Sequence, residues 1–183
     1  MPGNAFIRFE GDDKKFITGE STHKTHNGDK GWIEISDWSW DIEAETSFLK
    51  GAGASVGKPQ PGNLSITHYY DKASPKIMER IVMGTHFKTV QIAMLKQVGE
   101  DTGKGEVYFG IEMREAFITK VSSKGGEDGS VTQDVEMVFK TVSVGYKPQA
   151  LEGGRLAGQI PFDWDIGKMV IEGAPHMELT SLS

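Results

Sequence analysis

The chain has 183 residues, which is enough for one domain and too few for two full ones. Its 20 lysine and arginine residues against 26 aspartate and glutamate residues give a net charge of −6. This is the wrong sign for a broad nucleic-acid-binding face or for attraction to an anionic membrane surface. The absence of cysteine excludes disulfides, thiolate metal sites and cysteine nucleophiles.

Alternation of apolar and polar residues predicts the strands of the N-terminal half. The pattern indicates strands over residues 4–10, 32–42 and 64–70. Between the first two, the polar residues from Gly11 to Gly31 predict a long loop that builds no core. Residues 43–63 are rich in glycine and proline and longer than an ordinary connection, so we expect a loop or hairpin arm that projects from the body.

The sequence Ser74-Pro75 predicts the start of a helix that ends before Gly84. Serine is a good N-cap, proline suits the first helical position, and glycine suits the position just after a helix. Inside it, one apolar stripe is expected to face the core, formed by Ile77, Met78, Ile81 and Val82.

The C-terminal half predicts three further strands, over residues 87–95, 106–121 and 131–146. In the last of these strands, both the even-numbered and the odd-numbered residues include apolar side chains. Both faces are therefore expected to be partly buried, as in a barrel wall that packs against a neighbour. The remaining residues predict a tail with one apolar anchor at 162–166. With 23 glycines marking turns, we expect an all-β, mainly antiparallel fold with one flanking α-helix.

Several residue patterns resemble catalytic or metal motifs but lack the partners that such chemistry needs. Ser21 and Lys24 match S-x-x-K without its companion motifs, and His23 and His26 lack the further ligands that zinc demands. The segment Gly51–Lys58 fails the spacing of both phosphate-binding loops, and Pro59 follows it where a helix should begin. The acidic pairs at 12–13 and 127–128 are typical of solvent-exposed turns and not of a catalytic carboxylate pair. We therefore expect no enzyme activity, no catalytic residue, no metal site and no cofactor.

Three tryptophans leave one alternative open. Trp32, Trp38 and Trp40 are expected on the same face of one predicted strand, which favours a place in the core or along an interface seam. Their aromatic faces would equally suit a platform for a glycan or a small ligand in the mouth of a monomeric β-barrel.

The segment Tyr70-Asp71-Lys72-Ala73-Ser74-Pro75-Lys76 resembles the haemolysin-coregulated protein (Hcp) family, the tube protein of bacterial type VI secretion. The resemblance covers most of residues 5–150, and further family segments follow the same order, at 19–22, 32–34, 38–40, 51–58, 84–86 and 146–149. Residues 162–166 resemble the family's tail anchor. We therefore expect an Hcp-like β-barrel domain over residues 1–150 and a C-terminal tail over 151–183, too short for a fused effector enzyme.

The resemblance implies a small β-barrel, six copies of which close into a ring. Rings stack head to tail into a tube whose partners are the type VI spike protein, the sheath and effector proteins in the lumen. The family's extended loop reaches the adjacent ring, which makes Phe48, Leu49, Lys50 and Lys58 the expected stacking residues. The motif residues at the helix start are Tyr70, Asp71, Lys72, Ser74 and Pro75.

The N-terminal residues MPGNAFIRFE lack a cationic start followed by an apolar signal region. We expect synthesis in the cytoplasm and then secretion through the type VI system without a cleaved signal peptide. A second interpretation with the same fold is the tail tube protein of a phage or of another contractile injection particle.

Overall fold

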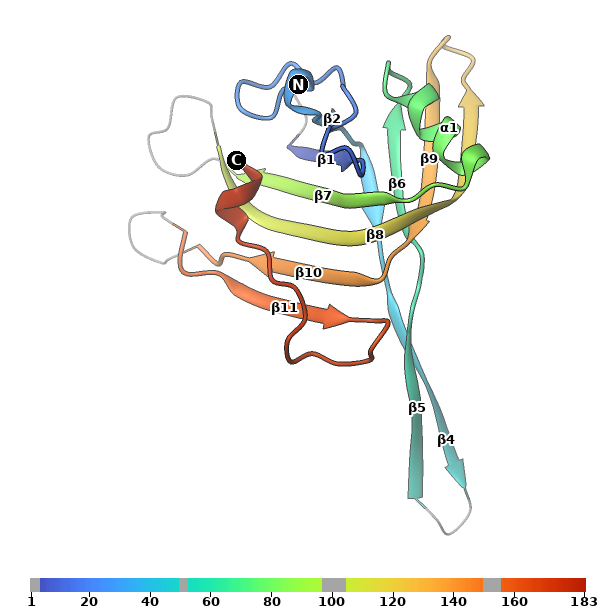
Figure 1. Ribbon diagram of the computed structural model, residues 1–183, viewed down its shortest axis with the longest axis vertical. Helices are drawn as coiled ribbons and strands as arrows, with labels where there is room; N and C mark the ends of the chain where they lie inside the picture. The colour runs from blue at the N-terminus through green and yellow to red at the C-terminus, as the bar shows by residue number, and fades with distance from the viewer. Residues whose placement is uncertain (1–3, 50–52, 97–104, 150–155) are drawn as a thin grey trace.

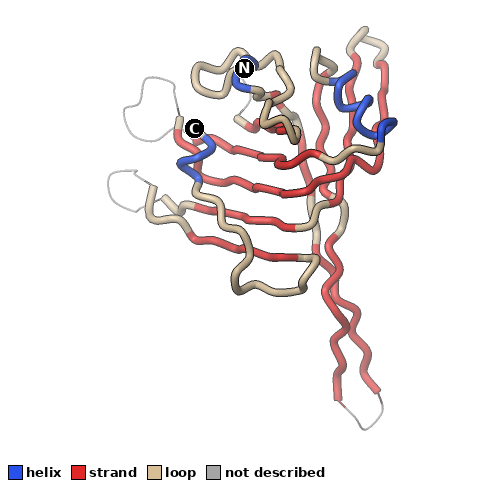
Figure 2. The backbone as a smooth tube through the Cα atoms, viewed as in Figure 1, coloured by secondary structure: helices blue, strands red, loops and turns tan. Residues whose placement is uncertain are grey.

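Antiparallel strands dominate the computed structural model, which describes residues 4–49, 53–96, 105–149 and 156–183 (Figure 1). Its strands are β1 (Ala5–Glu10), β2 (Ile33–Glu34), β3 (Asp37–Ser39), β4 (Ile42–Leu49), β5 (Gly53–Pro61), β6 (Leu64–Tyr69), β7 (Phe87–Lys96), β8 (Glu106–Gly125), β9 (Val131–Val138), β10 (Thr141–Tyr146) and β11 (Ile160–Asp165). The helical elements of the described residues are α1 (Ser74–Met83) and two short 3-10 helices, Gly28–Lys30 and Leu179–Leu182 (Figure 2).

Nine of the described strands form one sheet that turns back on itself. The strand order is β2-β1-β7-β8-β9-β6-β3, and β10 and β11 extend the sheet from β8. The two ends of this path, β2 and β3, are neighbours in the chain. Between them, the Ile35 amide donates to Ala5 O (3.0 Å) and the Ser36 amide to Thr67 O (2.9 Å). The same short segment therefore links β1 to β6 and brings the two ends of the sheet together around a shared core.

Strand β8 forms the corner of this sheet. Its first part pairs with β7 and β10, and its second part pairs with β9. Between the two parts, Glu115 adopts a positive φ of 50° and the register with β9 shifts between Ile118 and Lys120. Such irregularities bend a strand. In Figure 1, β7 and the first part of β8 accordingly run roughly horizontally, while β6 and β9 run roughly vertically.

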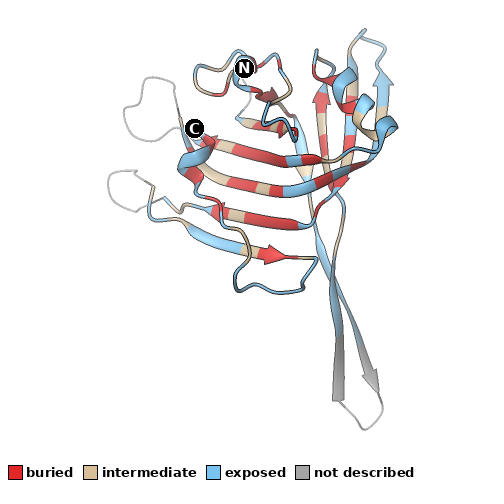
Figure 3. Cartoon of the chain, in the orientation of Figure 1, coloured by how far each residue is buried: buried red, intermediate tan, exposed pale blue. Residues whose placement is uncertain are grey.

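Buried residues recur along the strands (Figure 3), and their apolar side chains pack into one core cluster inside the bend. Ile7, Phe9, Phe87, Ile92 and Met113 are fully buried there. Trp164 of β11 also belongs to this cluster, so the predicted anchor at 162–166 is a strand of the sheet.

The opposite face of β1, β7 and β8 carries a second apolar cluster, and here two predictions were wrong. The C-terminal segment Pro175–Ser183 is more than a tail with one anchor, because Met177, Leu179 and Leu182 are buried in this cluster. The loop from Gly11 to Gly31 also contributes to the interior, because His26 is 1% exposed. Both segments cover a face of the sheet that would otherwise be apolar and in water.

The predicted strand 32–42 is divided into β2, β3 and the start of β4, since this segment must pair with β1 and then with β6. The predicted strand 131–146 is also divided. Phe139 and Lys140 separate β9 from β10, which pair with different parts of β8.

Helix α1 has the predicted extent, with Gly84 in the left-handed conformation (φ 68°) at its C-terminal end. Its N-cap is Ala73 rather than the predicted Ser74, which lies inside the first turn. The predicted apolar stripe was half wrong: Ile77 is buried and Ile81 partly buried, whereas Met78 and Val82 face solvent, Val82 with 85% exposure. The helix therefore contacts the barrel along a narrower line than its sequence predicts.

Candidate functional site

The most prominent surface feature is the hairpin of β4 and β5, which confirms the predicted arm. Its ladder runs from Ile42 opposite Pro61 to Leu49 opposite Gly53, with a bulge between Ala44 and Thr46. In the described residues these two strands pair only with each other, and Figure 1 shows them extending away from the body. An isolated two-stranded hairpin is marginally stable in water, so this arm gains no support from other strands of the described chain.

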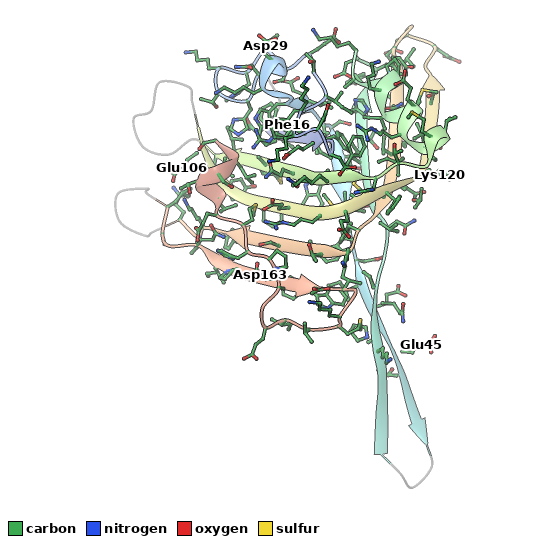
Figure 4. The ribbon with its side chains drawn as sticks, in the orientation of Figure 1. Phe16, Asp29, Glu45, Glu106, Lys120 and Asp163 are labelled. Atoms are coloured by element: carbon green, nitrogen blue, oxygen red, sulfur yellow. The ribbon has the colours of Figure 1, made fainter. Side chains whose placement is uncertain are left out.

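The predicted stacking residues lie on this arm. Phe48 and Leu49 are in β4, with backbone partners Ala54 and Gly53, and Lys58 is an exposed residue of β5. Lys50 and the side chains of Phe48 and Leu49 lie outside the described residues. Glu45 also belongs to the arm, and Figure 4 shows it well away from the other labelled side chains. The stacking role of these residues stays a prediction.

An apolar hollow of about 240 Å³ lies at the foot of the arm. Ile42 and Pro59 of the arm line it together with Phe162, Trp164 and Ile171. Ile171 is 65% exposed, which is unusual for a large aliphatic side chain. Sequence reasoning missed this surface because the arm and β11 are distant in the sequence and lie next to each other only in the folded chain.

The motif residues at the helix start hold the chain as it turns from β6 into α1. The Asp71 carboxylate accepts the Ala73 amide (2.9 Å) and lies 3.3 Å from the Ser74 hydroxyl. The Asp71 amide in turn donates to Ser74 Oγ (3.0 Å). Burial raises the pKa of Asp71, and the nearby His68 and these hydrogen bonds oppose that rise. This geometry gives Asp71 and Ser74 a structural role.

The other motif residues are at the surface. Tyr70 is 41% exposed, and its amide donates to Val131 O (2.9 Å), which joins the turn to the start of β9. Lys72 and Pro75 are exposed. Behind them the interior is polar: Gln133 Nε2 donates to Ser74 O (3.3 Å), and Gln133 Oε1 lies 2.7 Å from His68 Nε2, both side chains being fully buried. Since Oε1 is an acceptor, His68 must carry its proton on Nε2.

The patterns considered for catalysis and metal binding have structural partners. His26 Nε2 lies 2.6 Å from Leu182 O, and its ring stacks on Phe6 at 5.3 Å. Ser21 Oγ accepts the His23 amide. From Gly53 on, the glycine-rich segment is strand β5, whose amides pair with β4 instead of forming an anion cradle. Among the described residues, no group of three or more His, Asp or Glu side chains is arranged to hold a metal ion.

The tryptophans are used in packing. Trp32 is fully buried in the outer cluster, and Trp38 stacks on Phe109 with ring centroids 5.4 Å apart. The Trp40 ring lies 5.7 Å from that of Phe139, and its Nε1 donates to Gly62 O (3.1 Å) at the base of the arm. The platform that a glycan-binding interpretation needs is thus occupied by the protein's own residues.

These features define a small antiparallel β-protein whose distinctive surface is a projecting hairpin. A family model described as "Type VI secretion system effector, Hcp" matches residues 6–146. The Pseudomonas aeruginosa protein hcp1 is 32% identical over 156 residues, which cover 84% of this chain and 92% of that protein.

Solved structures agree in fold. Hcp1 from Salmonella typhimurium is 27% identical and has a TM-score of 0.67, covering 91% of this chain and 97% of that one. A structure described as a type six secretion system protein has a TM-score of 0.77 at 24% identity, with the same coverage. The chain belongs to the Hcp family of type VI secretion, and it is a secreted, tube-type protein of that system. In the described residues no helix has the length and apolarity needed to cross a membrane.

Proposed function

We propose that this chain is a structural subunit of the type VI inner tube, without catalytic activity of its own. Six copies close into a ring by one repeated head-to-tail contact, and the rings stack. The tube leaves the cell through the type VI machinery, in contact with the spike protein and the sheath, and its lumen carries or stabilises effector proteins.

The observation that carries this proposal is the β4–β5 arm. Residues 41–46 and 57–60 are exposed or nearly so along both strands, and the described arm pairs with no other strand of the chain. A second copy that received the arm would cover this surface and complete its hydrogen bonding. The apolar hollow at the foot of the arm offers a further contact on the same side of the molecule.

The arm is tested by replacing Phe48 and Leu49 together with aspartate. Rings are expected to persist, because the arm lies outside the barrel core, while stacked tubes are lost, because two carboxylates would have to be buried between rings. Electron microscopy would count tubes, and light scattering would check the mass of the ring. The control is Lys124→Asp with Val131→Asp, two exposed residues at the ends of β8 and β9 beside their connecting turn, which should form tubes normally. Tubes of normal length from the arm variant would refute the stacking role.

A further inference from the structure

A hollow of about 530 Å³ lies where β8 bends. One row of residues in register crosses its floor from strand to strand: Glu10 pairs with Thr89, Thr89 with Arg114, Arg114 with Thr141, and Thr141 with Asp165. Arg114 therefore stands in the centre with a threonine on each side. Both threonines are 7% exposed, and their hydroxyls have no hydrogen-bond partner among the described residues.

Positive charge surrounds this row. The hollow is lined by four cationic residues, namely Arg114, Lys88, Lys140 and Lys168, and by three acidic ones. A fourth carboxylate, that of Glu112, lies outside the lining, 3.8 Å from Arg114 Nε. Only Lys140 has a partner in the hollow, Glu115 at 3.6 Å.

Arg114 keeps most of its hydrogen-bonding capacity. Its Nε lies 3.8 Å from the Glu112 carboxylate, which is beyond hydrogen-bond distance, and its side chain is 46% exposed. A guanidinium with two free terminal nitrogens binds a carboxylate or a phosphate through two parallel hydrogen bonds. The side chains of Lys88 and Lys168 have no ion-pair partner in the described part of the chain.

The remaining carboxylates of the hollow lie at the two ends of the row. Glu10 interacts electrostatically with Arg8, on the same strand. Asp165 is buried, and its Oδ1 accepts the Lys168 amide (3.0 Å). The centre of the row therefore presents one guanidinium and two hydroxyls, a donor set for an anion.

We propose that this hollow is a binding site for a ligand with two or more carboxylate or phosphate groups. One group is held by Arg114 between the hydroxyls of Thr89 and Thr141, and the others are held by Lys88 and Lys168 at the rim. The volume is in the range of small-molecule sites and exceeds what a single oxyanion fills.

Isothermal titration of the full chain with citrate and with inorganic pyrophosphate, against chloride at matched ionic strength, tests this site. Saturable binding of at least one probe is expected, and the stronger of the two shows whether carboxylate or phosphate is the preferred group. No saturable heat from either probe would overturn the proposal.

Variants locate the binding. Arg114→Gln should weaken it at least tenfold, and Lys88→Gln with Lys168→Gln should do the same while leaving the row intact. Lys124→Gln, which changes an exposed lysine near the end of β8, should bind like the unmodified chain. Equal binding by all variants would place the anion elsewhere and refute the site. Ring mass, measured on the same samples, reports separately on assembly.

Discussion

Replacing Gly110 with valine is expected to release the C-terminal segment from the sheet. A Cβ at Gly110 would lie 2.5 Å from Leu182 Cδ1 and 2.7 Å from Leu179 Cδ2, so both buried leucines would have to move. A Cβ at Gly145 of β10 would likewise lie 3.1 Å from Leu179 Cδ2. Overpacking and exposure of two leucines should together lower the free energy of unfolding by about 2 to 4 kcal/mol.

Urea unfolding and limited proteolysis would measure this effect, with cleavage expected between β11 and the C-terminus. The control is Gly125→Val in the same strand, where an added Cβ meets no atom within 4 Å. If Gly110→Val is as stable and as protease-resistant as the control, then the segment does not occupy the groove between Gly110 and Gly145.

Acidification is expected to destabilise the protein through His26. Burial lowers the pKa of His26 to about 4, and the hydrogen bond to Leu182 O opposes this shift only in part. Above pH 6.5 the imidazole is neutral in both the folded and the unfolded chain. Between about pH 6.5 and 4 the unfolded chain takes up a proton that the folded chain excludes, so stability falls with pH, by up to about 3 kcal/mol.

The contribution of His26 is isolated by comparing the chain with its His26→Gln variant at a series of pH values and one protein concentration. The difference in unfolding free energy between the two proteins should shrink as the pH falls from 7 to 4. A difference that stays constant over this range would mean that His26 is not held neutral by burial.

The arm and most strands could be predicted because their signals are local. Alternation over residues 4–10 and 64–70 indicates strands without any knowledge of the partner strand, and β1 and β6 lie there. The glycine and proline content of residues 43–63 likewise indicated an excursion from the body, which the structure confirms as a hairpin.

The errors arose where burial depends on distant residues. Leu179 and Leu182 look like tail residues until Gly110 and Gly145, on two other strands, open a groove beneath them. His26 lies in a polar stretch and is buried because Phe6 and Trp32 offer ring faces to it. Alternation across residues 32–42 is continuous, so only the change of pairing partner at Ile35 and Ser36 reveals the break.

The candidate assembly surface could be predicted only in part. The family resemblance predicted a stacking role for the arm, and the motif residues Asp71 and Ser74 have a structural role that their spacing before the helix explains. The hollow at the foot of the arm and the in-register row around Arg114 depend on strand pairing, which no local pattern specifies.

The central claim, a closed ring of copies of this chain, is tested most directly by the solution mass. Light scattering after size-exclusion chromatography, with negative-stain images of the same peak, would measure it. Six copies of the 20.1-kDa chain predict about 121 kDa and annular particles. A single species of 20.1 kDa at the highest concentration reached, with no annular particles, would contradict the account.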